Sequence, residues 1–344
     1  MFQIRKNVFR KDILNIEIAS EKLDVTLSSI GASIFDIKYV DKNATKESVV
    51  AHPTCMNEFC DSSAYYGRIV GRTSGRIDKG EFTLDGEKYN LDKNWNGISC
   101  LHGGKFGVSL KNFDIKSVEN LGDSVEVEFE TTAKDGESGF CGDLKILIKY
   151  IITADGIEIE YHGKSNKKTL CNLTNHTYFN LSGNCKNDCL NHEIYLNASK
   201  YGNVNEELIA TSFENMEENY IFNFKSPKKL SKDIYSIKLQ NHIAKGYDHP
   251  FLLDDCKNAG YIYESESGRK LSLSTTYPCV VMYATCYPDG CIVSSGKEIA
   301  KYGGICLEAQ HIPNGVNTNK QDSSILNACE EYFYKTKFEF SIGE

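Results

Sequence analysis

The chain has 344 residues, of which 40% are hydrophobic and 25% charged, and its formal net charge is −8 at pH 7. This composition is ordinary for a globular protein with a large core. The acidic balance, without any block of Lys or Arg, argues against nucleic acid or an anionic membrane as the main partner. No apolar run reaches the ~18 residues of a membrane span, and the alternating residues 3–18 do not resemble a secretory signal.

The stretches that alternate apolar and polar residues most regularly are 82–84, 89–91, 125–130, 146–152, 157–161 and 334–340. This period of two predicts half-buried strands, and Asp85-Gly86 and Asp155-Gly156 predict tight turns between them. The 20 Tyr and 17 Phe also suit pleated sheets. Helical periodicity is weak, and residues 201–219 are the best candidate for a short helix plus loop.

Long antiparallel runs of this kind predict an all-β fold, a large antiparallel β-sandwich with few short helices. The length alone would allow two domains, but all-β folds often extend further as one unit. Because no linker, repeat or low-complexity tract interrupts the chain, we predict a single domain over residues 1–344.

Three of the six arginines of the chain lie between residues 67 and 77, namely Arg68, Arg72 and Arg76. Elsewhere Lys greatly outnumbers Arg, so this segment favours a rigid, planar donor. Binding of a phosphate or carboxylate is one interpretation, and forked hydrogen bonds to sugar hydroxyls or to a catalytic carboxylate is another. A turn with solvated arginines remains the simpler alternative.

Two further segments carry histidines. Leu101-His102-Gly103-Gly104 is typical of a tight loop where the backbone approaches a ligand, although a structural histidine fits equally well. In the segment 172–181, a strand would place Leu173, Phe179 and Leu181 on one face and Thr174, His176 and Tyr178 on the other. A histidine among hydroxyl groups suits proton transfer near neutral pH.

Two acidic residues complete the candidates. In the segment 303–314, a strand would place Cys306, Glu308 and Gln310 on the face opposite the core. Partial burial raises the pKa of a carboxyl toward that of a base useful at neutral pH. Asp248 could accept hydrogen bonds from sugar hydroxyls, or could simply form a turn beside Pro250.

The 13 cysteines are scattered without any CxxC pair, which indicates free, mostly buried thiols in a cytoplasmic protein. Cys185, Cys189 and His192 come closest to a zinc-ligand set. Their spacing matches no standard four-ligand pattern, so no metal site is predicted.

Together, these segments resemble the galactose mutarotase (aldose 1-epimerase) family. Their order matches, from an arginine-glycine segment ending in Arg-Ile, through Leu-His-Gly-Gly, Asn-Leu-Thr-Asn-His-Thr-Tyr-Phe-Asn-Leu and an Asp-His dipeptide, to Cys-Leu-Glu-x-Gln. The resemblance covers about residues 67–317. The motifs around His176 and Glu308 are the specific ones.

The resemblance implies an isomerase that interconverts the α and β anomers of a free hexose such as galactose or glucose. It implies that Glu308 is the general base, that His176 is the general acid, and that His102, Asp248 and Arg76 bind the sugar. It implies no metal and no organic cofactor. The expected partner is the small-molecule sugar alone, with the protein as a monomer or homodimer.

The sequence also departs from the family pattern. Gly75 replaces the usual Asn before Arg76, and Arg68 and Arg72 remain rivals for the role of Arg76. The tryptophan expected after the His-Gly-Gly loop is absent, and the only one, Trp95, lies just upstream. These departures leave the preferred sugar open.

Three alternatives remain. One is an epimerase for hexose phosphates, with the three arginines around a phosphate. Another is a non-catalytic sugar-binding protein of the same fold, since a fold does not fix a function. A glycoside hydrolase, with Asp248 and Glu308 as the two carboxylates, would leave the motif around His176 unexplained.

Overall fold

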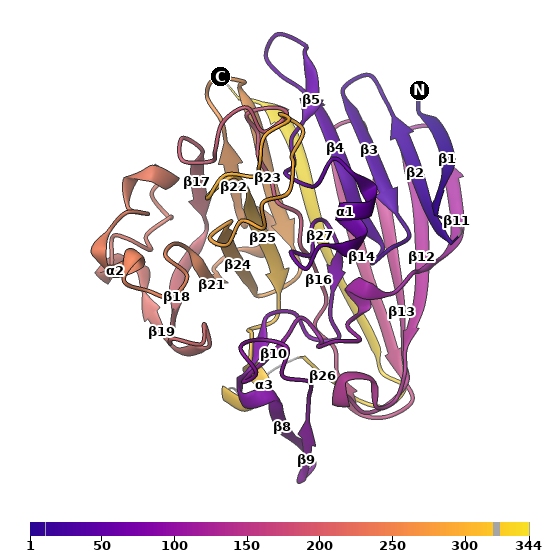
Figure 1. The fold of residues 1–344 in the computed structure, drawn as a ribbon, viewed down its shortest axis with the longest axis vertical. Coiled ribbons are helices and arrows are strands. Elements are labelled where there is room, and N and C mark those ends of the chain that lie inside the picture. The colour runs from indigo at the N-terminus through magenta and orange to yellow at the C-terminus, as the bar shows by residue number, and fades with distance from the viewer. Residues whose placement is uncertain (11, 319–323, 344) are drawn as a thin grey trace.

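The computed structural model describes residues 1–10, 12–318 and 324–343. Within this part of the chain three larger sheets stand out, and Figure 1 shows them as two layers. The first contains, in order, β1 (Gln3–Arg10), β2 (Ile13–Ala19), β3 (Leu23–Ser28), β4 (Ser33–Val40) and β5 (Lys46–Ser48). The second contains β11 (Asp114–Asn120), β12 (Val125–Ala133), β13 (Leu144–Ile152), β14 (Gly156–Ser165), β27 (Glu331–Ile342), β23 (Arg269–Thr275), β22 (Gly260–Tyr263), β17 (Glu193–Leu196) and β20 (Lys228–Lys229). The third contains β19 (Ala210–Asn215), β18 (Ala198–Val204), β21 (Asp248–Leu253), β24 (Cys279–Ala284) and β25 (Ile305–Gln310).

Short strand pairs and helices connect these sheets. The pairs are β7 (Arg76–Ile77) with β10 (Cys100–Leu101), β6 (Ile69–Val70) with β16 (Thr174–Asn175), β15 (Thr169–Leu170) with β26 (Ile325–Leu326), and β8 (Glu81–Leu84) with β9 (Glu87–Asn90). The α-helices are α1 (Met56–Asp61), α2 (Ile237–Gln240) and α3 (Gly315–Thr318). None of the helices among the described residues has the length and apolar character that a membrane crossing requires.

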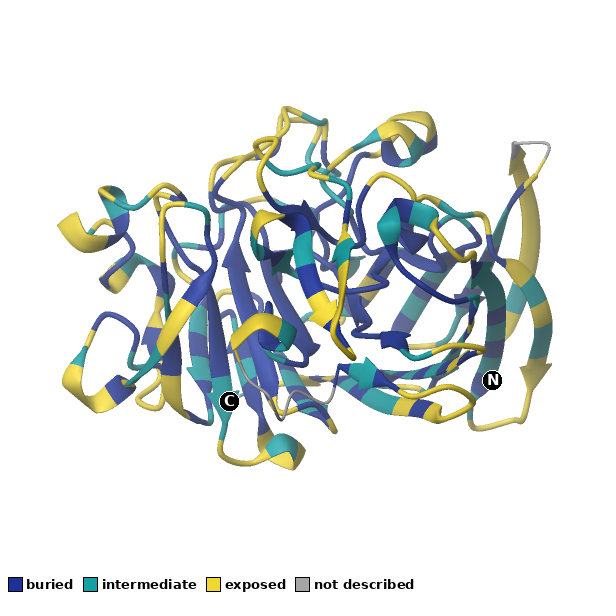
Figure 2. Ribbon diagram, turned by 90° about the horizontal axis from the view of Figure 1, so that it is seen from below, coloured by how far each residue is buried: buried dark blue, intermediate teal, exposed yellow. Residues whose placement is uncertain are grey.

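The predicted alternation is confirmed where strands pack on one face only. Along β12 and β13, buried residues alternate with partly exposed ones, and the β8–β9 hairpin turns at Asp85-Gly86 as predicted. The N-terminal sheet packs against the longest sheet, since the Tyr150 hydroxyl of β13 donates to the Ala32 carbonyl at 2.6 Å. Apolar residues of all three sheets join one core between the layers, seen as the dark blue interior of Figure 2. The predicted β-sandwich is therefore confirmed.

Strands β24 and β25 differ from this pattern because all their residues are buried. The strands pair with each other near the centre of the molecule (Figure 1), with Val281 opposite Glu308. One face of β25 meets the core through Ile305, Leu307 and Ala309. The other face, which carries Glu308 and Gln310, borders a cavity.

The prediction of a helix within residues 201–219 is wrong. This stretch forms the end of β18 and all of β19, which pair as a hairpin, followed by a single 3₁₀ turn at Met216–Glu218. The partners of β18 decide the outcome, because its other edge pairs with β21 more than 40 residues away along the chain. A local pattern cannot report such a pairing, and tertiary context overrides weak propensity.

Candidate active site

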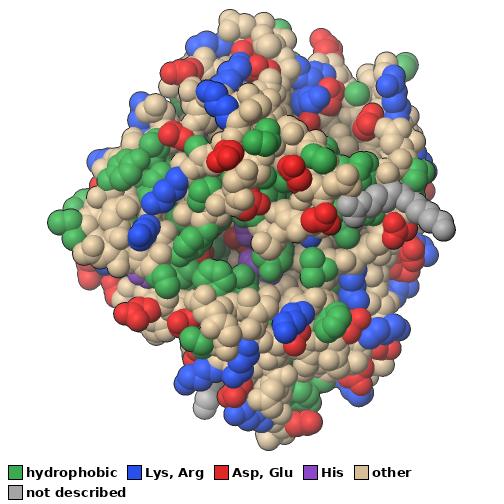
Figure 3. Space-filling model, in the orientation of Figure 1, with side chains coloured by type: hydrophobic (Ala, Val, Ile, Leu, Met, Phe, Trp, Pro, Cys, Tyr) green, Lys and Arg blue, Asp and Glu red, His purple; other side chains and the backbone are tan. Residues whose placement is uncertain are grey.

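A cavity of about 490 Å³ opens at the centre of the molecule. Figure 3 shows it as a hollow with histidine side chains at its floor. All five candidate residues from the sequence line this cavity, although they come from distant parts of the chain: Arg76, His102, His176, Asp248 and Glu308. Its volume lies within the range of small-molecule sites, about 300–1,000 Å³.

Glu308 lies on the cavity face of β25, as the period of two predicted. Its side chain is almost fully buried, and its Oε2 atom has no hydrogen-bond partner among the described residues. Burial raises the pKa of this carboxyl well above its ordinary value, the negative charge of Asp248 adds to the rise, and Arg76 opposes it. The carboxyl therefore favours its neutral form while the cavity is empty.

His176 directly follows the two-residue strand β16, so the predicted continuous strand over 172–181 is only partly correct. Beyond Asn175 the pairing becomes irregular, since the His176 N–H donates to the Arg68 carbonyl at 2.9 Å whereas the His176 carbonyl accepts from the Gly67 N–H at 2.9 Å. The predicted orientation still holds at the cavity, which His176 and Tyr178 both line.

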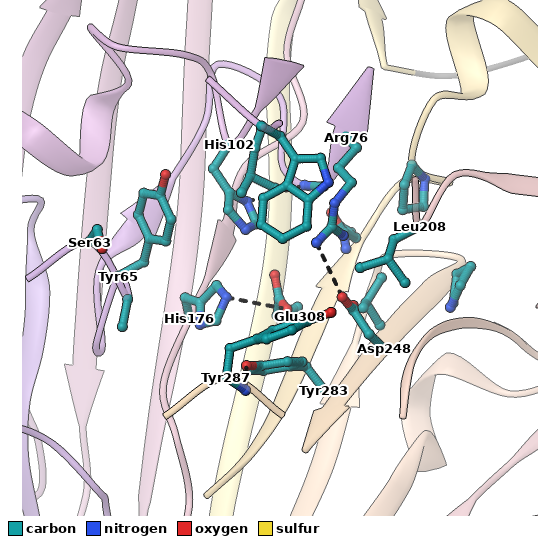
Figure 4. Close-up of a pocket in the computed structure, with 18 of the residues that line it drawn as sticks. Ser63, Tyr65, Arg76, His102, His176, Leu208, Asp248, Tyr283, Tyr287 and Glu308 are labelled. Atoms are coloured by element: carbon teal, nitrogen blue, oxygen red, sulfur yellow. Dashed lines mark hydrogen bonds and ion pairs between the residues drawn. The ribbon is translucent and has the colours of Figure 1, made fainter. Parts of the chain in front are cut away.

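The imidazole of His176 is held between two groups of β25. Its Nε2 lies 3.6 Å from Glu308 Oε1, the contact dashed in Figure 4, and its Nδ1 lies 3.6 Å from Cys306 Sγ. The ring of Tyr178 stacks on it at 5.0 Å between centroids. Burial lowers the pKa of His176 to about 4, so this ring is neutral at pH 7 when no ligand is bound.

Glu308 and His176 therefore form a coupled pair with opposite shifts. Burial penalises the charged form of both groups, which raises the pKa of the carboxyl and lowers that of the imidazole. Both shifts favour the uncharged form of each group, so the pair tends to keep its shared proton on the Glu308 carboxyl rather than on the imidazole. Such a pair can give a proton at one point of a ligand and accept one at another.

His102 follows β10 and adopts a left-handed backbone conformation, with φ of 48°. The Gly75 N–H donates to its Nδ1 at 3.2 Å, so in the neutral ring the proton sits on Nε2. Burial, with smaller effects of His176 and Arg76, lowers the pKa of His102 well below its ordinary value. This histidine is therefore a neutral hydrogen-bond donor at the cavity.

The glycines after His102 were expected to let the backbone approach a ligand, and the structure shows a further reason for the first of them. A Cβ atom on Gly103 would collide with the carbonyl of Gly71, so the close approach is between two backbone segments. The glycine is needed because the loop packs on the arginine segment, which helps to fix His102 beside His176 at 5.2 Å between ring centroids.

His102, His176 and Glu308 could also hold a metal ion, since their ligand atoms lie within 4.8 Å of one another. A metal bound at His102 Nε2 would have to replace its proton, and the neutral ring would then carry a proton on Nδ1. That proton would face the Gly75 N–H, which donates to the same atom. The donor set therefore fits a hydrogen-bonding histidine better than a metal ligand.

Cys185, Cys189 and His192 are engaged elsewhere. His192 Nε2 accepts a hydrogen bond from the Leu181 N–H at 2.9 Å, and the thiol of Cys189 donates to the Phe179 carbonyl at 3.6 Å. These side chains satisfy local backbone groups and do not form a zinc-ligand set.

Arg76 and Asp248 form another part of the cavity wall. Arg76 Nη2 lies 3.3 Å from Asp248 Oδ2, the second dashed contact of Figure 4. The guanidinium also lies over the indole of Trp95 at 4.3 Å. Both charged side chains keep polar atoms at the cavity, and together they are close to neutral.

Arg68 and Arg72 do not reach the cavity, so they are no longer rivals of Arg76. Arg68 is buried and donates to the Cys60 carbonyl at 2.8 Å and the Ser109 carbonyl at 3.3 Å. Arg72 donates to the Cys141 carbonyl at 2.7 Å and to several other oxygens. The interpretation of solvated arginines is also wrong, because both side chains tie loops together inside the protein.

Apart from Tyr178, the sequence did not predict which aromatic residues would form the cavity wall. Tyr65, Tyr283, Tyr287 and Trp95 all line it. Tyr65 packs edge-on against His102 at 4.8 Å. Among 20 tyrosines no local pattern marks these three, whereas Trp95 stood out as the single tryptophan, seven residues before His102, although no role was predicted for it.

A buried carboxyl in contact with an imidazole at the wall of a cavity defines the class of protein: an enzyme that moves protons on a small polar molecule. Comparison with known proteins gives the family. The aldose 1-epimerase family matches residues 15–339 of the chain. The chain therefore belongs to the aldose 1-epimerase family, which makes it an isomerase that acts on a sugar.

Two relatives illustrate the match. The galactose mutarotase of Rattus norvegicus is 32% identical over 331 residues, which cover 95% of this chain and 94% of that protein. The aldose 1-epimerase of Escherichia coli K12 is 30% identical over 326 residues, which cover 92% and 91%. These matches confirm the resemblance drawn from the motifs.

Solved structures share the fold. The galactose 1-epimerase of Lactobacillus acidophilus aligns with a TM-score of 0.87 at 22% identity, covering 100% of this chain and 99% of that one. An aldose epimerase homologue from C. elegans aligns with a TM-score of 0.85 at 24% identity, covering 96% and 99%.

Proposed function

We propose that this enzyme interconverts the α and β anomers of a free hexose such as galactose or glucose, with Glu308 as general base and His176 as general acid. The observation that carries the assignment is the contact of 3.6 Å between His176 Nε2 and Glu308 Oε1 at the wall of the central cavity. A sugar with its anomeric carbon between these groups would present its O1 hydroxyl to one and its ring oxygen to the other.

In the proposed reaction, ionised Glu308 takes the proton of the O1 hydroxyl while protonated His176 donates its Nε2 proton to the ring oxygen. The bond between C1 and the ring oxygen breaks, and C1 becomes the carbonyl carbon of an open-chain aldehyde. Rotation about the C1–C2 bond then exposes the other face of the carbonyl. The hydroxyl formed from the ring oxygen then attacks C1 and gives its proton to His176, while Glu308 returns its proton to the carbonyl oxygen, which becomes O1 of the opposite anomer.

The other polar residues would bind and orient the sugar. His102 donates from Nε2, Asp248 accepts from hydroxyls, and Arg76 donates through the guanidinium edges that its ion pair leaves free. Fixed geometry of this kind supplies much of the advantage of an enzyme over a bimolecular reaction in water. No step requires a metal or an organic cofactor, because each proton moves between the sugar and these side chains.

A hexose phosphate is disfavoured as the substrate. Phosphate recognition needs cationic groups that converge, and two of the three arginines of the segment are committed to buried carbonyl groups. Arg76 alone reaches the cavity, and Asp248 neutralises it. A non-catalytic sugar-binding role would leave the buried proton-transfer pair without a purpose, since an unpartnered carboxyl oxygen is costly to bury.

The remaining proposals concern the setting of the enzyme. We infer one functional domain over residues 1–344, because the cavity draws residues from position 76 to position 310. All 13 cysteines lie in the described ranges and none of them forms a disulfide, which supports a cytoplasmic location. The net charge of −8 supports the absence of nucleic acid and membrane partners, and we propose a monomer or homodimer.

Polarimetry of freshly dissolved α-D-galactose, α-D-glucose and α-D-glucose 6-phosphate tests the proposal, with the spontaneous drift subtracted. The enzyme should accelerate the approach to equilibrium of one or both free sugars, and the Glu308→Gln variant should not. Faster turnover of the phosphate would overturn the choice of substrate. No acceleration of any sugar would point to a binding protein.

A further inference from the structure

The chain has a single tryptophan, Trp95, and neither the family motifs nor the proposed mechanism gives it a role. It lies in the turn that precedes His102 and it lines the cavity. The indole is half-buried, and its Nε1 atom has no hydrogen-bond partner among the described residues. The position of this ring is therefore not explained by a hydrogen bond of its own.

The charged side chain of Arg76 lies over the indole. The guanidinium carbon lies 4.3 Å from the centre of the ring, well within the ~6 Å over which a cation is attracted by an aromatic face. At one edge of the guanidinium, Arg76 Nη2 lies 3.3 Å from Asp248 Oδ2. The Nε atom of Arg76 has no partner among the described residues.

The contact with Trp95 fixes the plane of the Arg76 guanidinium without engaging its N–H donors. The five N–H groups of a guanidinium point outward in its own plane. A ring that covers the face of the group leaves these donors free, and the ion pair with Asp248 occupies only one edge. Trp95 can therefore hold Arg76 flat while the remaining N–H groups stay available to the hydroxyls of a sugar.

The turn that carries Trp95 is well anchored. Trp95 N–H donates to the Ser99 carbonyl at 3.0 Å, and Ser99 N–H donates back to the Trp95 carbonyl at 3.1 Å. The side chain of Asn94 bonds both backbone groups of Leu101, at 2.8 and 2.9 Å. Because Leu101 precedes His102, the indole and this histidine are tied to the same rigid segment. Tyr287 adds an edge contact at 6.3 Å.

We propose that Trp95 is a positioning residue, which acts through Arg76 and fixes its guanidinium for binding the sugar. The inference rests on the proposed function, since it assumes that Arg76 contacts the sugar. It goes further because it assigns the role to a side chain outside the family motifs, and because it excludes direct stacking of the sugar on the indole as the main effect.

A double-mutant cycle tests the proposal. KM and kcat for the preferred sugar are measured for wild type, Trp95→Leu, Arg76→Met and the double variant. Trp95→Leu should raise KM by about 3- to 30-fold, the range of a partly desolvated cation–π contact, with a smaller change in kcat. In the Arg76→Met background, the same change should have almost no further effect, because coupled residues are not additive.

Two further variants separate positioning from packing. Trp95→Phe keeps an aromatic face and should restore most of the wild-type KM, whereas Trp95→Leu does not. Tyr220→Leu removes a strongly exposed aromatic ring that does not line the cavity, and it should leave both constants unchanged. Melting temperatures of all variants show whether the fold is intact.

Binding can also be followed without turnover. As the single tryptophan, Trp95 is the only source of indole fluorescence, and titration of the inactive Glu308→Gln variant with sugar should change its emission. With Arg76→Met added, most of this change should disappear. Additive effects on KM, or an unchanged emission response without Arg76, would mean direct contact with the sugar and would overturn the proposal. An unchanged KM in Trp95→Leu would overturn it as well.

The failure of the inference and that of the proposed function are distinguishable. If wild type accelerates mutarotation but the cycle is additive, only the role of Trp95 is wrong. If wild type accelerates no sugar, the proposed function fails and the assumption about Arg76 fails with it.

Discussion

Replacing Glu308 with Gln should stabilise the protein at alkaline pH while it abolishes turnover. The carboxyl is almost fully buried and one of its oxygens has no partner among the described residues. An unsatisfied buried polar group costs about 1–3 kcal/mol, and more when it is charged. The amide has nearly the same shape and cannot ionise, so the variant avoids the cost of a buried charge.

The direction of this change in stability follows from the linkage between protonation and folding. Burial raises the pKa of Glu308 in the folded protein above its unfolded value, so the wild type loses stability as the pH rises from the unfolded pKa through the folded one. Wild type and variant should therefore differ little near pH 4.5. At pH 8 to 9 the variant should be more stable by about 1–3 kcal/mol, which raises the melting temperature of a chain of this length by roughly 1–4 °C.

Glu264 offers a matched control, because it is as buried as Glu308 but lies outside the cavity. Burial would raise the pKa of Glu264, but hydrogen bonds from the Ser267 side chain and from the N–H groups of Glu266 and Ser267 outweigh this and lower it. Glu264→Gln weakens these bonds and should therefore destabilise the protein at neutral pH, by about 1–3 kcal/mol, without loss of turnover.

The assay compares thermal melting of the three proteins from pH 4.5 to 9, alongside polarimetry. Opposite shifts in melting temperature for the two variants, with activity lost only in Glu308→Gln, are the expected result. The reasoning is refuted if Glu308→Gln melts below wild type at pH 8 to 9. A wild-type rate in that variant would remove Glu308 from the mechanism.

Three further predictions concern other residues of the site. His176→Asn should lower kcat by about 10²- to 10⁴-fold, as measured by polarimetry; an unchanged rate would move the acid role to His102. Arg76→Met should raise KM, because it removes a guanidinium that lines the cavity. Arg72→Met should unfold at a lower temperature, because each carbonyl left unpaired costs about 1–3 kcal/mol, and should leave KM near that of wild type; equal KM changes in the two variants would contradict this division. The rate should follow a bell in pH, falling in acid as a second proton binds the pair near the pKa of about 4 of His176 and in alkali as Glu308 loses its proton. A flat profile between pH 3.5 and 10 would exclude paired acid–base catalysis.

Much of the fold could be predicted because its strands are half-buried. Alternation marks a strand when one face is wet, as in β12 and β13. It also placed Glu308 and Gln310 on one face of β25, which the structure shows at the cavity. The hairpin of β18 and β19 was missed because its stability depends on pairing with β21, which no local period records.

The separate roles of the three arginines could not be predicted from the sequence. Arg68, Arg72 and Arg76 recur every four residues and have the same chemistry, so the sequence left all three as candidates. Their roles are set by distant partners: the carbonyls of Cys60 and Cys141 for the first two, and Asp248 for the third. Only the fold can show which guanidinium meets a carbonyl and which meets a cavity.

The number of protons held by Glu308 and His176 connects their burial with the proposed chemistry. The empty cavity favours neutral Glu308 and neutral His176, whereas the mechanism begins from the ionised carboxylate and the imidazolium. Both states hold one proton, so none has to be taken from water. A sugar hydroxyl that donates to the carboxylate lowers the pKa of Glu308, and a ring oxygen that accepts from Nε2–H raises the pKa of His176. In the proposed mechanism, binding of the sugar would therefore shift the proton across the 3.6 Å contact toward the reactive state. The same burial, which favours the neutral forms of both groups, would confine that charge separation to the complex with the sugar.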